Sequence, residues 1–143
     1  MKLIVATLEL PLDENYDGSM FADWDAVADW AKPYIGVLVN LGIVQGSLED
    51  MQLFINADSN ITRQEMVAMT VRALAIDVPV GDIPSRSIYD LQTAAEWARD
   101  SLVFAVNNDM INIDEGYVNP TADAKRSEAA MMIYRMLEFI IRT

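Results

Sequence analysis

The stretch Ile-Thr-Arg-Gln-Glu at residues 61–65 decides how the middle of this chain folds. Thr62, followed three residues later by Glu65, has the spacing of a capping box, in which each side chain accepts a backbone N–H of the other residue. Ile61 and Met66 have the spacing of the hydrophobic staple that accompanies such a helix start. The stretch therefore predicts that a helix begins at Arg63.

An arginine at the first position of a helix needs compensation. The helix dipole already places partial positive charge at this end, and a second positive charge there costs about 0.3–1 kcal/mol. Two explanations stay open. Arg63 could pair with a nearby carboxylate, for which Asp23 and Asp90 are candidates. It could instead bind an anionic ligand together with free backbone N–H groups of the helix.

The composition bounds the possible functions. The chain has 143 residues, the size of one domain or of two small repeats that share a core, and 52% of them are hydrophobic. It contains no cysteine and no histidine, which excludes disulfides, thiolate nucleophiles, Cys/His zinc sites and histidine bases. We therefore expect no enzyme activity, no cofactor and no metal site. The net charge of -12 disfavours binding to nucleic acid or to an anionic membrane.

The N-terminal segment is predicted to be an arm. Residues 2–10, KLIVATLEL, have the composition of a β-strand, and the sequence predicts no partner strand for it. A lone strand has to pair with the sheet edge of a neighbour. The apolar run at residues 3–8 is shorter than the hydrophobic region of a signal peptide, so we expect no export signal in this chain.

The rest of the chain contains an internal repeat. Residues 23–43 align with residues 90–110 through the pairs Trp30-Ala31 and Trp97-Ala98, and residues 54–74 align with residues 117–137. Each copy has an aspartate, a helix near the Trp-Ala pair, a loop, and a second helix opened by Arg-x-Glu. The two tryptophans either pack in the core, which is the default for tryptophan in an apolar helix, or line a sugar groove.

This ordered pattern resembles the S-layer homology family. The residues that carry the resemblance are Phe21-Ala22-Asp23, Trp30-Ala31, Tyr34-Ile35, Leu41-Gly42-Ile43, Gly46, Phe54 and residues 61–65 in the first copy, and Tyr89-Asp90, Trp97-Ala98, Tyr117, Asn119-Pro120 and residues 126–130 in the second. The resemblance implies an all-α fold with two tandem helix-loop-helix repeats that share a central helical bundle, to which we add the N-terminal β-strand arm. The predicted organisation is an arm at residues 1–20, a first repeat at 21–80 and a second at 81–143.

The second copy departs from the pattern at two positions. It has Lys125 where the first copy has its capping Thr62, so we expect its helix to start earlier, capped by Thr121 or Asp123. It also has Asp109 in place of Gly42. Family members usually carry three repeats around a pseudo-threefold axis, and two are found here. We therefore expect a homo-oligomer or a further domain to complete the bundle.

The resemblance also implies a function. S-layer homology units hold acidic, often pyruvylated, secondary cell-wall polysaccharides, so the chain is predicted to be a non-catalytic module that anchors a protein at the bacterial cell surface. Arg63 is the first candidate to face the carboxylate of the polymer and Arg126 the second. The residues expected to shape the grooves are Asp23, Asp90, Trp30 and Trp97. The alternative is a structural assembly protein that reuses the fold, such as a phage virion component, with its N-terminal strand paired to a neighbouring subunit.

Overall fold

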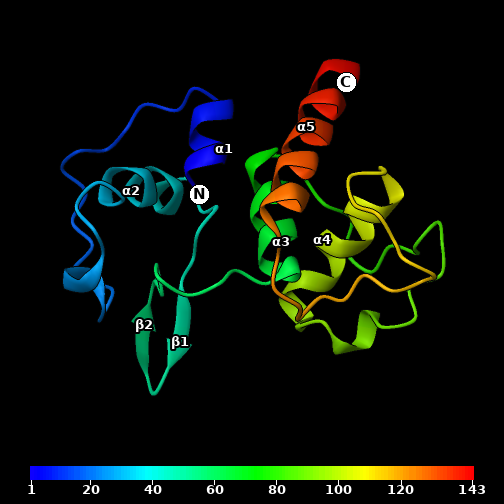
Figure 1. The fold of residues 1–143 in the computed structure, drawn as a ribbon, viewed down its shortest axis with the longest axis horizontal. Coiled ribbons are helices and arrows are strands. Elements are labelled where there is room, and N and C mark those ends of the chain that lie inside the picture. Colours follow the sequence, from blue (N-terminus) through cyan, green and yellow to red (C-terminus); the bar gives the residue numbers. More distant parts are fainter. The chain divides into compact units, whose positions relative to one another are not determined.

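The computed structural model describes all 143 residues of the chain. It has five α-helices and one two-stranded antiparallel sheet (Figure 1). The predicted helical character is therefore confirmed, but an all-α fold did not include the small sheet. The chain divides into two compact units, Met1–Ser59 and Asn60–Thr143. The division between these units reflects how the residues pack. It differs from the predicted boundary between the two sequence repeats, at residues 80 and 81, and that repeat organisation stays a prediction.

The first unit contains α1 (Lys2–Thr7), the 3₁₀-helix η1 (Trp24–Ala26), α2 (Lys32–Asn40), β1 (Ser47–Glu49) and β2 (Gln52–Phe54). Helix α1 packs against α2, and its core side chains Ile4 and Val5 are buried together with Ile35 and Leu38 of α2. This unit therefore builds its core from the N-terminal segment and the first long helix.

The prediction of an N-terminal β-strand arm is wrong, because residues 2–7 form helix α1. Ile4 and Val5 are adjacent in sequence and both are buried, whereas a strand would point them to opposite faces. In a short run where almost every residue is apolar, the hydrophobic period cannot separate a strand from a buried helix. Packing against α2 decides for the helix.

The β1–β2 hairpin is also absent from the sequence prediction. Leu48 pairs with Leu53 and Ser47 with Phe54, and the two-residue turn between the strands has positive φ at Asp50 (46°) and Met51 (65°). Positive φ at both positions is the signature of a type I′ hairpin turn. Methionine is unusual at such a turn position, and strands of three residues are too short to show an alternation of apolar and polar residues. The sequence therefore does not predict this hairpin.

The second unit contains α3 (Arg63–Ala73), the 3₁₀-helix η2 (Leu91–Thr93), α4 (Glu96–Asn107) and α5 (Arg126–Arg142). Helix α3 packs against both α4 and α5 (Figure 1). The largest fully buried side chains of this core are Leu102, Met110, Met132 and Met136. A wider bundle, completed by a further subunit or domain, stays a prediction.

The two predicted helix starts have different outcomes. Helix α3 begins at Arg63 as predicted: the N–H of Thr62 donates to Glu65 Oε2 (2.7 Å) and the N–H of Glu65 donates to Thr62 Oγ1 (3.4 Å). Helix α5 begins at Arg126, so the earlier start capped by Thr121 or Asp123 is wrong. Residues 122–124 are held in extended pairing with residues 61–63, since Thr62 bridges Asp123. They are therefore unavailable to the helix.

The packing of the second unit predicts a large loss of stability for Leu102→Ala. Leu102 lies in α4, which packs against α3, and is 1% exposed; truncating a buried leucine costs about 2–5 kcal/mol. Urea unfolding should show this decrease in the free energy of unfolding. Ile141→Ala is the control, because Ile141 is 82% exposed and its truncation should change the free energy of unfolding by less than about 0.5 kcal/mol. Equal effects would contradict the described core.

Candidate functional site

Asp23 and Asp90 make the same contacts in the two units. The carboxylate of Asp23 accepts the backbone N–H groups of Ile55 and Asn56, both at 2.8 Å. The carboxylate of Asp90 accepts those of Val118 (3.0 Å) and Asn119 (2.8 Å). Each carboxylate is thus occupied by two backbone N–H groups, so neither of these aspartates is the partner of Arg63.

Asn56 and Asn119 explain why these loops need such a tie. Both have positive φ, 50° and 49°, a conformation that asparagine tolerates better than most residues. The two hydrogen bonds from each aspartate fix the chain as it leaves this conformation. The aspartates therefore shape the loops, and their oxygens face the protein backbone.

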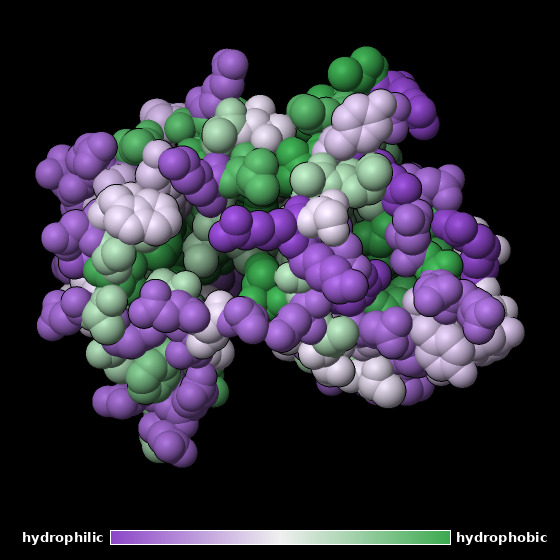
Figure 2. Space-filling model, viewed as in Figure 1, coloured by the Kyte–Doolittle hydropathy of each residue, from purple (hydrophilic) through white to green (hydrophobic).

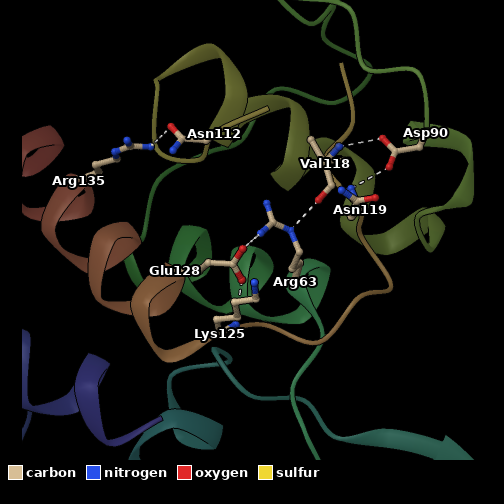
Figure 3. A network of polar contacts seen from close by, with 8 residues as sticks. All are labelled: Arg63, Asp90, Asn112, Val118, Asn119, Lys125, Glu128 and Arg135. Carbon is tan, nitrogen blue, oxygen red and sulfur yellow. Dashed lines mark hydrogen bonds and ion pairs between the residues drawn. The ribbon is translucent and has the colours of Figure 1, made fainter. Parts of the chain in front are cut away.

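Arg63 lies inside a polar network of the second unit (Figure 3). Its Nε donates to the carbonyl of Val118 at 2.7 Å, and its terminal nitrogen NH1 forms an ion pair with Glu128. The side chain of Arg63 is only 16% exposed. Two explanations were open for Arg63: pairing with a carboxylate of the chain, or binding an anionic ligand. The structure shows the ion pair, and the carboxylate is that of Glu128 instead of Asp23 or Asp90.

The N-terminus of α3 is closed by carbonyls of the same unit. The N–H of Arg63 donates to the carbonyl of Ala122 and that of Gln64 to the carbonyl of Pro120, both at 2.9 Å. The N–H of Glu65 donates to the hydroxyl of Thr62. No backbone donor of the first turn is left for a ligand.

The N-terminus of α5 is open. Arg126 is exposed, and its side chain makes no hydrogen bond or ion pair. The backbone N–H groups of Arg126, Ser127 and Glu128 have no acceptor, and the side chain of Lys125 at the N-cap position carries only donors, so it cannot cap them as Thr62 caps α3. A guanidinium, a lysine and three free N–H groups therefore meet at the positive end of a long helix.

The two tryptophans are exposed. Trp30 is 67% and Trp97 is 53% exposed, so of the two explanations left open for these residues, packing in the core is wrong, and a role in a sugar groove stays a prediction. The guanidinium of Arg72 lies 5.7 Å from the centre of the Trp97 ring. Burial lowers the pKa of Arg72 from its ordinary value, but arginine stays charged in proteins. Trp97 thus presents an aromatic face beside a cation on the α3–α4 pair.

The structure brings some of the predicted site residues together and leaves others apart. Arg63 and Asp90 belong to one network through Val118. Arg126 stands outside that network, and Asp23 and Trp30 lie in the first unit. The sequence analysis missed Glu128, although its position in the second Arg-x-Glu matches that of Glu65 in the first. No group of acidic side chains is suited to hold a metal ion, and no helix is long and apolar enough to cross a membrane.

Comparison with known proteins identifies the first part of the chain. Residues 21–67 match the family model of the S-layer homology domain. The chain carries an S-layer homology domain. Such domains are non-catalytic modules that anchor surface proteins to the cell wall. The family named from the Arg-x-Glu and Trp-Ala patterns is therefore confirmed.

Three relatives of this chain are much longer proteins. The chain is 30% identical to an amylopullulanase of Thermoanaerobacterium thermosulfurigenes over 129 residues, which is 88% of this chain and 7% of the relative. It is 30% identical over 129 residues, again 88% of the chain, to the exoglucanase XynX of Acetivibrio thermocellus, of which it covers 11%. It is 33% identical over 73 residues to a surface-layer 125 kDa protein of Lysinibacillus sphaericus, covering 51% of the chain and 6% of the relative. The chain thus spans a small fraction of each of these relatives.

The network around Arg63 predicts that this arginine stabilises the second unit. Arg63→Gln leaves the carboxylate of Glu128 and the carbonyl of Val118 without their donors, and we expect the free energy of unfolding to fall by about 2 kcal/mol. Arg126→Gln, the matched change at the other signature arginine, should change it by less than about 0.5 kcal/mol. Urea unfolding of both variants measures the difference. Equal stabilities would contradict the described ion pair.

Proposed function

We propose that this chain anchors a protein to the bacterial cell surface by binding an acidic, pyruvylated secondary cell-wall polysaccharide, with a carboxylate of the polymer held at the N-terminus of α5. The observation that carries the proposal is the open state of this helix end. Arg126 and three backbone N–H groups have no partner within the chain, although the corresponding groups of α3 are all occupied.

A carboxylate suits this helix end chemically. It can accept two N–H bonds from a guanidinium in parallel, and it can also accept backbone N–H groups at a helix start, where the dipole favours negative charge. Lys125 adds a second cation beside them. Arg126 is therefore the residue to which we assign the main contact.

Arg63 has a different role in this proposal. Its guanidinium is already bound to Glu128 and to the carbonyl of Val118, and it is largely buried. A polymer carboxylate would have to compete with Glu128 for it. We assign Arg63 to the support of the loop before α5, which includes Val118, Asn119 and the turn that leads to Lys125.

The exposed tryptophans supply the second kind of contact that a polysaccharide needs. Aromatic rings present an apolar face of the size of a sugar ring, and a buried tryptophan could not do so. Trp97 with Arg72 is the candidate in the second unit, and Trp30 is the candidate in the first. Asp23 and Asp90 contribute indirectly by fixing the loops that they bind.

The proposal is tested by sedimentation with purified cell-wall sacculi that carry the pyruvylated polymer. Arg126→Gln should weaken retention about tenfold, which is the effect expected for loss of one charge-assisted, bidentate contact. Lys2→Gln makes the same charge change on an exposed residue of the first unit and should be retained like the wild type. Sacculi whose pyruvyl groups have been removed should retain none of the three proteins. Equal retention of Arg126→Gln and the wild type would overturn the assignment.

A second candidate function is assembly through α5, as in a virion or another structural array. Tyr134, Leu137 and Ile141 follow one another at helical spacing, and all three are exposed. Figure 2 shows hydrophobic residues at the surface of the C-terminal end of α5. An apolar stripe of this kind is a usual site of protein association.

Light scattering over a range of concentrations separates this second function from anchoring. Assembly predicts an oligomer that dissociates in Leu137→Lys and persists in Met20→Lys, since Met20 is an exposed residue of the first unit outside the stripe. A monomer at every concentration, with a gain of mass on adding the polymer, would exclude assembly through α5 and would agree with anchoring.

A further inference from the structure

A hollow of about 530 Å³ lies in the second unit, between the loop after α4 and the C-terminal half of α5. Its wall includes Arg86, Arg135, Arg142, Asn108, Asn112 and Phe139. We propose that this hollow is a binding site for a small anionic sugar, one that carries a carboxylate or a phosphate group. The site uses none of the residues assigned above to the polymer.

The charge of the hollow is opposite to that of the chain. Three of the 10 basic side chains of a protein with net charge -12 line it, against two acidic side chains, Asp109 and Glu138. Arg86 pairs with Asp109 at 2.7 Å and a terminal nitrogen of Arg142 lies 3.7 Å from Glu138 Oε1, so Arg135 is the arginine of the wall that has no carboxylate partner and gives the wall its excess of positive charge. An anion is the ligand that such a wall favours.

The hydrogen-bonding groups of the wall are mainly donors that are still free. Arg135 donates one N–H to Asn112 Oδ1 at 2.9 Å, and this bond also fixes the amide of Asn112 (Figure 3). The remaining nitrogens of Arg135 and the Nδ2 of Asn112 have no acceptor. Arg86 uses only one of its three nitrogens, which donates to Asp109 (2.7 Å) and to the carbonyl of Val106 (3.3 Å). Because each guanidinium carries five N–H groups, most of them are left for a ligand that supplies acceptors.

The other lining groups fit a sugar. The volume lies in the range of small-molecule sites. The amides of Asn108 and Asn112 can both donate to and accept from hydroxyl groups, and the half-buried ring of Phe139 offers an apolar face. A free inorganic anion would use the arginines alone, whereas an anionic sugar would use all three kinds of group.

This site is separate from the N-terminus of α5. Arg135 follows Arg126 by nine residues, which is about 13 Å along the helix and about half a turn around it. The two arginines therefore lie on opposite faces of α5, and a ligand in the hollow does not reach the open helix start. The proposal stands or falls independently of the polymer site.

The test is ¹H–¹⁵N NMR titration of the full chain with glucuronate, with glucose 6-phosphate and with glucose as the uncharged control. We expect the side-chain amide of Asn112 and the backbone signals around Arg135 to shift with glucuronate or glucose 6-phosphate and not with glucose. The two acids tell a carboxylate site from a phosphate site. Shifts confined to residues 125–128 would belong to the open helix start and would overturn this proposal while agreeing with the first.

Variants make the assignment sharper. Arg135→Gln should raise the dissociation constant about tenfold, and Arg135→Lys should lose less because it keeps the charge. Lys2→Gln is the control for net charge and should bind as the wild type does. Binding of glucose as strong as that of the acids, or unchanged binding by Arg135→Gln, would overturn the proposal. A comparison of the NMR spectra without ligand shows whether each variant is folded.

Discussion

The guanidinium of Arg63 is the group on which the second unit depends. It joins the carbonyl of Val118 to the carboxylate of Glu128, and so ties the start of α3 to the loop before α5 and to the first turn of α5. Asp90 holds the same loop from its other side through the N–H of Val118. Glu128 in turn accepts the N–H of Lys125 at 2.8 Å, which sets the residue at which α5 begins. One arginine thus positions the helix start that we assign to the ligand.

The two Arg-x-Glu signatures share a sequence pattern and differ in what surrounds them. Around the first, the loop of residues 118–124 supplies the carbonyls of Ala122 and Pro120 to the backbone N–H groups, and Glu128 of α5 pairs with the arginine. Around the second, no segment of the chain plays this part. Groups left open in this way are hydrated in the free chain and are accessible to a ligand or to a further protein segment.

Local patterns in the sequence predicted local structure where the signal is specific, as at the capping box, and failed where it is weak, as at residues 2–7 and in the β1–β2 hairpin. The capping box at Thr62 and Glu65 placed the start of α3 correctly, because its determinants lie within four residues. The start of α5 was misplaced, since the extended pairing of Asp123 with Thr62 joins residues far apart in the sequence. The exposure of Trp97 and the partner of Arg63 were unpredictable for the same reason. They depend on how α3, α4 and the loop before α5 pack, which no single stretch encodes.

The proposed binding of an acidic polymer by this acidic chain raises an electrostatic problem. Long-range attraction is absent, because the net charge of -12 repels the polymer. At physiological ionic strength, charges more than about 8 Å apart are largely screened, so this repulsion is weak beyond the first contacts. What remains is the short-range geometry of a few donors, and these are more effective when they are held in place before binding. The network that fixes the start of α5, and leaves its N–H groups and Arg126 open, provides this kind of preorganisation without requiring a basic surface.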